Sequence, residues 1–176
     1  GGFVVALVTI FKKEWSPVTA PLYSVLEGLF LGAISVMYAS AYGGIVFNAI
    51  VLTLGIFAAM LFIYRSGIIS VTQRFRMGIV AATGGIALVY LASIVLGFFG
   101  INLTLVTGSG TFGIVFSLIV VVVAALNLVL DFDMIEKGAQ SNAPRYFEWY
   151  TAFGLMVTLV WLYLEILRLL AKLREE

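Results

Sequence analysis

The stretch FSLIVVVVAALNLVL, residues 116–130, decides the fold, because it contains one hydroxyl and one amide group among its side chains and is otherwise apolar. A bilayer core takes about 20 apolar residues as helix, so this run predicts a membrane-spanning segment. It is followed at once by Asp131, Asp133 and Glu136. These acids either mark an ordinary membrane boundary or include a carboxylate that is buried in the protein.

The composition of the whole chain also indicates an integral membrane protein. Of its 176 residues 62% are hydrophobic and 11% are charged, whereas soluble domains average about 25% charged residues. The net charge of +1 gives no sign of nucleic-acid binding. Cysteine and histidine are absent, which removes thiol chemistry and the commonest general base and zinc ligand. We therefore expect that the protein is not an enzyme, that it has no resident cofactor and that its helices lie in a lipid bilayer.

Hydropathy predicts five full spans, at about 19–40, 44–64, 77–99, 111–131 and 147–170. The first residues, GGFVVALVTIF, resemble the end of an earlier spanning helix. The expected fold is therefore an all-α polytopic transmembrane bundle, with residues 1–176 as a single, N-terminally incomplete transmembrane domain.

Charges in the loops predict the orientation. If all five segments span, one side of the membrane collects Lys12, Lys13, Arg65, Arg74, Arg76, Lys137 and Arg145. The positive-inside rule places this side in the cytoplasm. The opposite loops, 41–44 and 100–110, carry no charge. The last segment then takes Arg168, Lys172 and Arg174 outward, against the rule, so it either spans despite this basic end or re-enters the membrane.

A face of small residues runs along the first full span, at Ser24, Gly28, Gly32 and Ser35. Small residues at a spacing of four allow two membrane helices to approach closely. The face therefore predicts close packing inside the bundle or, as an alternative, an oligomer interface.

Three carboxylates fall within the predicted spans or at their ends: Glu27, Asp131 and Glu165. A charge at bilayer depth costs about 2.5–3.5 kcal/mol on insertion scales, so such residues normally face the bundle interior and find partners. Stepping back from Asp131 by helical turns gives Asn127, Ala124, Val121 and Ser117, a small and partly polar face. Asp131 is thus the candidate interior acid.

The other acids have more local interpretations. Asp133 lies about 200° around the helix from Asp131 and is expected at the membrane rim, paired with Lys137 at i+4. Glu165 either pairs with Arg168 at i+3 or faces Asp131 across a helix contact. Glu27 lies beside the small-residue face and is a possible member of the same polar interior.

If Asp131 and Glu165 meet in a site with little water, both cannot ionise cheaply, so they share one proton near neutral pH. The protonated form ties two helices together through an O–H···O bond. The ionised form repels and offers hard oxygen ligands to a cation such as calcium. This arrangement is a pH switch built without histidine.

Four stretches resemble the YccA-like bacterial branch of the Bax inhibitor-1 (transmembrane Bax-inhibitor-motif) family. They are PLYSVLEGLFLGAIS, YRSGIISVTQRFRMGIVAATGGIALVYL, ALNLVLDFDMIEKGA and YFEWYTAFGLMVTLVWLYLEILRLLAKL, and together they extend over most of residues 17–173. The most specific parts are LDFDMIE and LYLEILRLL. The resemblance implies a seven-helix bundle, of which residues 1–11 are the end of the second helix.

The resemblance also implies a function. Relatives have acids in the last two helices that share a proton and gate a calcium leak, and Asp131 and Glu165 match these positions. Here the second acid is glutamate, and the two lie 165 − 131 = 34 positions apart, a wider spacing than expected for the calcium-leak relatives. Another member of the family is a partner of a membrane-bound AAA protease. The expectations are therefore a pH-sensitive calcium leak in a bacterial plasma (inner) membrane or, as the alternative, a non-conducting partner of a larger membrane complex.

Overall fold

The computed structural model describes residues 2–41, 43–68, 71–100 and 111–175, which form six α-helices and one short 3-10 helix. In chain order these are α1 (Gly2–Phe11), η1 (Lys13–Trp15), α2 (Ser16–Ala41), α3 (Ile45–Arg65), α4 (Gln73–Phe98), α6 (Thr111–Gln140) and α7 (Tyr146–Glu175). No strand occurs among the described residues. The predicted all-α fold is confirmed.

Five helical segments are long and apolar enough to cross a membrane, as predicted: Lys13–Ser40, Ile45–Arg65, Gln73–Phe98, Thr111–Gln140 and Tyr146–Leu173. The main difference lies in α6, which continues past residue 131 to Gln140. Asp131 is therefore not at a helix end. The turn comes where Asn142 adopts a left-handed φ of 54°, a conformation that asparagine tolerates better than most residues.

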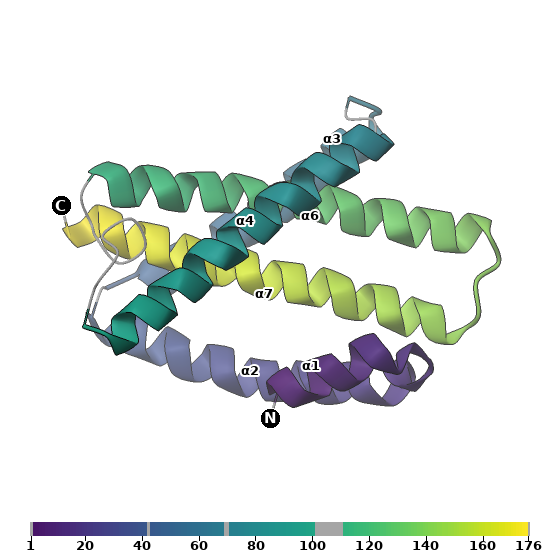
Figure 1. Ribbon diagram of the computed structural model, residues 1–176, viewed down its shortest axis with the longest axis horizontal. Helices are drawn as coiled ribbons and strands as arrows, with labels where there is room; N and C mark the ends of the chain where they lie inside the picture. The colour runs from purple at the N-terminus through teal and green to yellow at the C-terminus, as the bar shows by residue number, and fades with distance from the viewer. Residues whose placement is uncertain (1, 42, 69–70, 101–110, 176) are drawn as a thin grey trace.

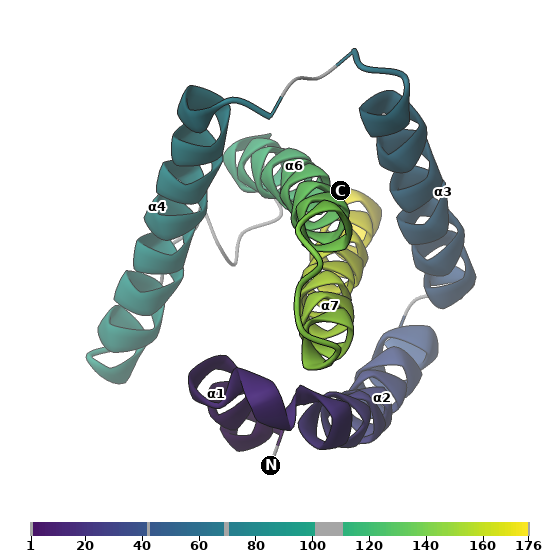
Figure 2. The same ribbon diagram turned by 90° about the vertical axis from the view of Figure 1, so that its right-hand side faces the viewer.

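The α6–α7 hairpin is the centre of the molecule (Figures 1 and 2). Figure 2 shows α3 and α4 on opposite sides of the hairpin, with α1 and α2 along a third side. The two helices pack along their length, and the largest fully buried apolar side chains include Val120, Leu128 and Val129 from α6 and Leu162 and Leu167 from α7. The valine and alanine run of α6 gives it a narrow surface, which favours the close approach of neighbouring helices.

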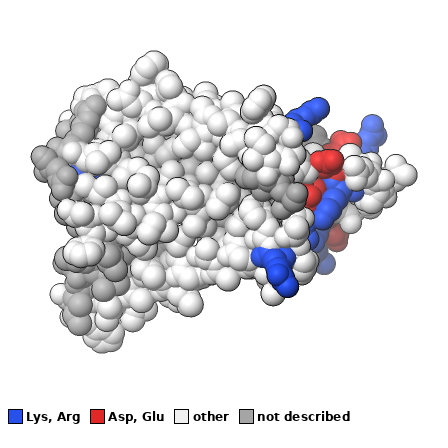
Figure 3. Space-filling model, turned by 90° about the horizontal axis from the view of Figure 1, so that it is seen from above, with Lys and Arg blue, Asp and Glu red and all other residues white. Residues whose placement is uncertain are grey.

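Charged side chains gather at one end of the molecule, on the face shown in Figure 3. The turns between α1 and α2, α3 and α4, and α6 and α7 all lie toward this end (Figure 1). This arrangement agrees with the predicted placement of the basic loops on one side. The opposite loop at residues 101–110 lies outside the described residues.

The small-residue face of α2 contacts α7 at its two serines but not at its two glycines, which are exposed. The Ser24 hydroxyl donates to Met156 Sδ at 3.1 Å, and the Ser35 and Tyr163 hydroxyls are 2.7 Å apart. A Cβ built on Gly28 or Gly32, however, would meet nothing within 4 Å. The predicted close packing inside the bundle is therefore not formed at the two glycines, whereas the alternative, an oligomer interface, stays a prediction.

Candidate functional site

Asp131 lies on the side of α6 that faces α7. A Cβ on Gly154 would lie 3.9 Å from Asp131 Oδ1, and the side chain of Thr158, one turn farther along α7, also lies close to the carboxyl group. The hydroxyl of Thr158 donates to the Gly154 carbonyl. Asp131 Oδ2 is buried and has no hydrogen-bond partner among the described residues. The structure thus places an acid inside the bundle with one oxygen unsatisfied.

Glu165 is 3% exposed and lies in the middle of a polar cluster between α4 and α7. The Tyr90 hydroxyl donates to Glu165 Oε1 at 2.6 Å, and Arg168 Nη1 is 3.9 Å from the same oxygen. The guanidinium also lies over the Tyr90 ring, 5.2 Å from its centroid. Among the described residues Glu165 Oε2 and Arg168 Nη1 have no hydrogen-bond partner. The predicted i+3 contact of Glu165 is therefore present, together with a tyrosine that the sequence did not indicate.

The structure does not bring Asp131 and Glu165 together. Asp131 faces Gly154, and Glu165 follows eleven positions later on the same helix. At 1.5 Å per residue this is a separation of about 16 Å along the helix axis. Near the other end of the hairpin, Lys172 Nζ donates to Ser117 Oγ at 2.8 Å. This contact has the same antiparallel register. The two carboxyls occupy different depths and have different partners, so the direct pair expected from the sequence is not formed.

Asp133 belongs to an ion-pair cluster at the charged end of the bundle. Its Oδ2 is 2.6 Å from Arg76 Nη2 and 3.1 Å from Lys137 Nζ. The predicted pairing with Lys137 is present, and the acid is only 8% exposed. Burial follows because Arg76, from the first turn of α4, covers this part of α6. Three positions farther along α6, Glu136 accepts a hydrogen bond from Tyr64 of α3.

The comparisons with known proteins give one clear result. A model of the family described as Bax inhibitor 1 like matches residues 1–175. This chain belongs to the Bax inhibitor 1 like family. No curated protein and no solved structure matches it. The family and the five apolar helices together establish a multi-pass membrane protein.

The other polar residues predicted for this Bax inhibitor 1 like protein take separate positions. Asn127 Nδ2 donates to Thr83 Oγ1 at 3.0 Å and to the Val123 carbonyl at 2.9 Å, so it links α6 to α4. Glu27 lies against α1, where a Cβ on Gly2 would be 2.8 Å from its Oε1. Neither residue contacts Glu165.

Glu27 nevertheless shares a cavity with the surroundings of Asp131. A cavity of about 460 Å³ between α1, α2, α6 and α7 is lined by Glu27 and by Gly154, the residue against which the Asp131 carboxyl packs. Its remaining wall is mostly apolar and aromatic, with Tyr23 and Phe153 in edge-to-face contact. The cavity therefore brings one carboxylate from α2 into the neighbourhood of the interior acid of α6.

Lys172, near the end of α7, turns into the helix bundle. Lys172 is 4% exposed, and its Nζ donates to the Gly113 carbonyl at 3.2 Å and to Ser117 Oγ at 2.8 Å. The Arg168 guanidinium lies over the Tyr90 ring and 3.9 Å from Glu165 Oε1. Lys172 is therefore inside the helix bundle rather than in a loop, where the positive-inside rule counts charges, whereas the Arg168 side chain is 40% exposed and lies beside Glu165 on its own helix. The spacing of Glu165, Arg168 and Lys172 on one helical face is the sequence signal for this arrangement.

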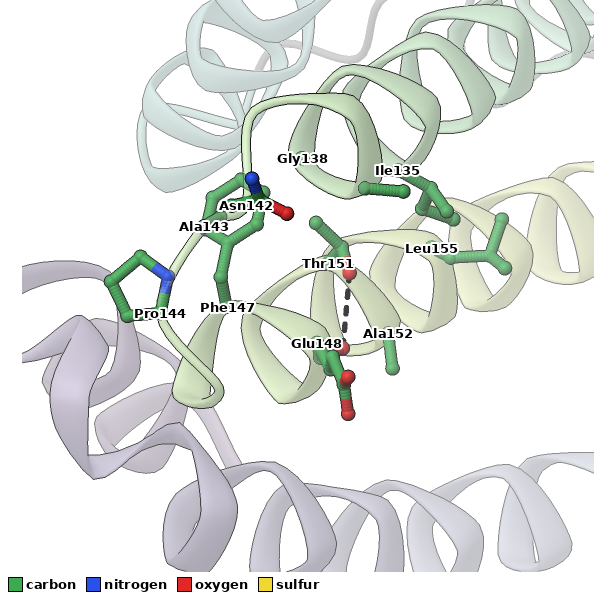
Figure 4. A pocket seen from close by; sticks show the side chains of 11 residues that line it. Ile135, Gly138, Asn142, Ala143, Pro144, Phe147, Glu148, Thr151, Ala152 and Leu155 are labelled. Atoms are coloured by element: carbon green, nitrogen blue, oxygen red, sulfur yellow. Dashed lines mark hydrogen bonds between the residues drawn. The ribbon is translucent and has the colours of Figure 1, made fainter.

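A separate pocket of about 590 Å³ lies at the α6–α7 turn (Figure 4). Phe147 fills the space left by the absent side chain of Gly138, and Thr151 donates to the Glu148 carbonyl at 3.0 Å. Glu148 is its single ionisable lining residue. Among the described residues no group of three or more acids, cysteines or histidines gathers to hold a metal ion. The packing of Phe147 against Gly138 stabilises the turn, and neither Asp131 nor Glu165 lines this pocket.

Proposed function

We propose that this protein is a cation leak pathway, with calcium as its substrate, in which Asp131 and Glu165 act at two successive depths. The observation that carries the proposal is the pair of buried carboxylates, each with one oxygen that lacks a hydrogen-bond partner. Buried polar atoms normally find a partner, and hard carboxylate oxygens are the ligands that calcium prefers. A cation that passes through the bundle would supply a partner for the unpaired oxygen of Asp131 and then for that of Glu165.

The path we infer begins at the cavity between α1, α2, α6 and α7. Glu27 supplies a negative charge at its wall, and the Asp131 carboxyl lies behind Gly154. Glu165 follows at about 16 Å along α7, held by Tyr90 and Arg168. Because Arg168 shares the Glu165 carboxylate, a cation must displace it to pass, so this cluster is the gate. Protonation of either acid removes a cation ligand, and leak should therefore fall on acidification.

Orientation and location are part of the same proposal. We infer that the charged end of the bundle faces the cytoplasm, since the loops that carry Lys12, Arg65, Arg74 and Arg145 all lie there. The resemblance to bacterial relatives supports a bacterial plasma membrane.

Calcium flux into proteoliposomes tests the pathway, with the parent compared with Asp131→Asn, Glu165→Gln and the double variant. We expect each single change to reduce flux about tenfold, the equivalent of losing roughly 1.4 kcal/mol of cation stabilisation. Glu148→Gln is the matched control, because this acid is exposed at the α6–α7 turn and outside the interior. Its flux should equal that of the parent.

The double variant separates two successive sites from a shared-proton pair. Effects of distant sites add in free energy, so two independent sites predict a reduction of about a hundredfold. A shared pair predicts that the second change adds little to the first. Absence of calcium flux in the parent, or flux that is indifferent to both changes, would refute the leak. Co-purification of a stoichiometric membrane partner would then support the alternative function as a non-conducting member of a larger complex.

A further inference from the structure

A third cavity, of about 850 Å³, lies between the first turns of α4 and the end of α6, where the α6–α7 turn begins. It is distinct from the interior acids, since neither Asp131 nor Glu165 lines it. Its wall combines the ion-pair cluster with a strip of apolar side chains. The residues that matter here are Arg76, Val80, Leu130, Asp133, Met134 and Lys137.

The polar part of this cavity carries an excess of positive charge. Arg76 and Lys137 share the single carboxylate of Asp133, which leaves one positive charge over. The side chains of Arg76 and Lys137 are 39% and 59% exposed, whereas that of Asp133 is 11% exposed. The acid therefore lies beneath the cations and the cations face outward. Glu136 does not line this cavity; with Tyr64 it lines a separate pocket on the α3 side of α6.

The location of Arg76 adds to this preference for anions. It lies in the first turn of α4, where Thr72 caps the helix by accepting a hydrogen bond from the Phe75 amide. The N-terminus of a helix carries a partial positive charge, which stabilises a nearby anion. A guanidinium also has five N–H donors, so its bond to Asp133 does not use its full capacity.

The apolar part of the cavity begins directly beside these cations. Val80 follows Arg76 by one turn of α4, and Leu130 and Met134 lie on α6 next to Asp133. Val80 is 59% exposed and Met134 40% exposed. Charged residues gather at this end of the bundle and the adjoining surface is uncharged on the face seen in Figure 3. The cavity therefore has a basic end, at Arg76 and Lys137, directly beside a strip of exposed apolar surface.

We propose that this cavity binds an anionic phospholipid, with the phosphate between Arg76 and Lys137 and an acyl chain along Val80 and Met134. Basic pockets between membrane helices are known to favour anionic headgroups. A phospholipid satisfies both halves of the cavity at once, since its phosphate meets the excess cation and its chain covers exposed apolar surface. A free phosphate ion would satisfy only the first half.

Native mass spectrometry of the detergent-solubilised protein, loaded from equal amounts of phosphatidylglycerol and phosphatidylcholine, tests the site. The measured quantity is the ratio of bound anionic to zwitterionic lipid. We expect the parent to favour phosphatidylglycerol. Lys137→Gln removes the excess charge and leaves the Arg76–Asp133 pair intact, so the ratio should fall about fivefold. Asp133→Asn removes the carboxylate that neutralises one of the two cations, so the ratio of bound anionic to zwitterionic lipid should rise by a similar factor.

Two further variants separate this site from its alternatives. Arg145→Gln removes an exposed cation at the same end of the bundle but outside the cavity lining, and should leave the ratio unchanged. Val80→Trp fills the apolar strip and should reduce retention of both lipids. Added inorganic phosphate should not displace the lipid.

Several results would overturn the site. These are equal retention of the two lipids by the parent, an equal loss in Arg145→Gln and Lys137→Gln, or unchanged retention in Val80→Trp. Displacement by inorganic phosphate would indicate a simple anion site instead. Size-exclusion profiles that match the parent confirm that each variant is folded, and Lys137→Gln keeps the test decisive if Asp133→Asn does not fold.

Discussion

Replacing Tyr90 with phenylalanine removes a single hydroxyl group from the contact between α4 and the central hairpin. The ring remains in edge-to-face contact with Phe116, at a centroid distance of 6.1 Å, and still lies beneath the Arg168 guanidinium. What is lost is the 2.6 Å hydrogen bond to Glu165 Oε1. The Glu165 carboxyl is then left with Arg168 at 3.9 Å as its remaining described partner.

The size of the effect follows from the charge of the acceptor. Hydrogen bonds to charged groups contribute about 1.5–3 kcal/mol, whereas hydrogen bonds between membrane helices average about 0.6 kcal/mol and reach about 1.7. For a buried acid with few alternatives we expect a loss of about 1–2 kcal/mol. Tyr163→Phe is the matched control, since its hydroxyl pairs with the neutral hydroxyl of Ser35 at 2.7 Å. It should cost about 0.6 kcal/mol.

Equilibrium unfolding in lipid bicelles measures both losses, and a double-mutant cycle with Glu165→Gln identifies the partner. In the Glu165→Gln background, Tyr90→Phe should cost no more than the control, because the acceptor is then neutral. Amide hydrogen exchange should also become faster in α4, whose buried contacts with α6 are centred on Ile86. Equal costs for Tyr90→Phe and Tyr163→Phe, or the same cost of Tyr90→Phe in both backgrounds, would refute the assigned role of Tyr90.

Two further predictions concern the backbone. Gly138→Ala should destabilise the protein by about 1–3 kcal/mol, since the added Cβ would lie 2.7 Å from Phe147 Cδ1. The control is Gly28→Ala, where a Cβ meets nothing within 4 Å, and this change should be neutral or stabilising by up to about 1 kcal/mol. The same unfolding assay compares the two variants, and equal costs would contradict the packing of Phe147 against Gly138. Asn142→Ala should cost about 1 kcal/mol and Asn142→Gly close to nothing, because φ is 54° at this position; a thermal midpoint for the alanine variant equal to that of the glycine variant would contradict the left-handed turn.

Much of the fold could be predicted from local sequence. Each predicted span corresponds to a helix, and the Asp133–Lys137 contact follows from a spacing of four on one helix. The inward direction of Asp131 also followed from the small and polar residues one and two turns before it. These features depend on periodicity within one helix, which the order of residues determines directly.

Partners from other helices could not be predicted in this way. Tyr90 reaches Glu165 and Arg76 reaches Asp133 from α4, and nothing in the run around Tyr90 distinguishes it from other apolar span residues. Helical periodicity specifies the direction of a side chain around its axis, but it does not specify the depth at which two helices are matched. That depth depends on where the hairpin turns.

The sequence by itself determined a helical membrane protein with acids in its interior and basic loops at one end. The tertiary structure alone decided that Asp131 faces Gly154 and that Glu165 lies about three turns deeper, with Tyr90 and Arg168. The physical reason is the position of the turn at Asn142, which follows Asp131 by 142 − 131 = 11 residues but precedes Glu165 by 165 − 142 = 23 residues. In an antiparallel hairpin, residues equally far from the turn lie opposite each other. The longer arm on α7 therefore carries Glu165 past the depth of Asp131, and only a turn placed later in the chain would have brought the two carboxyls together.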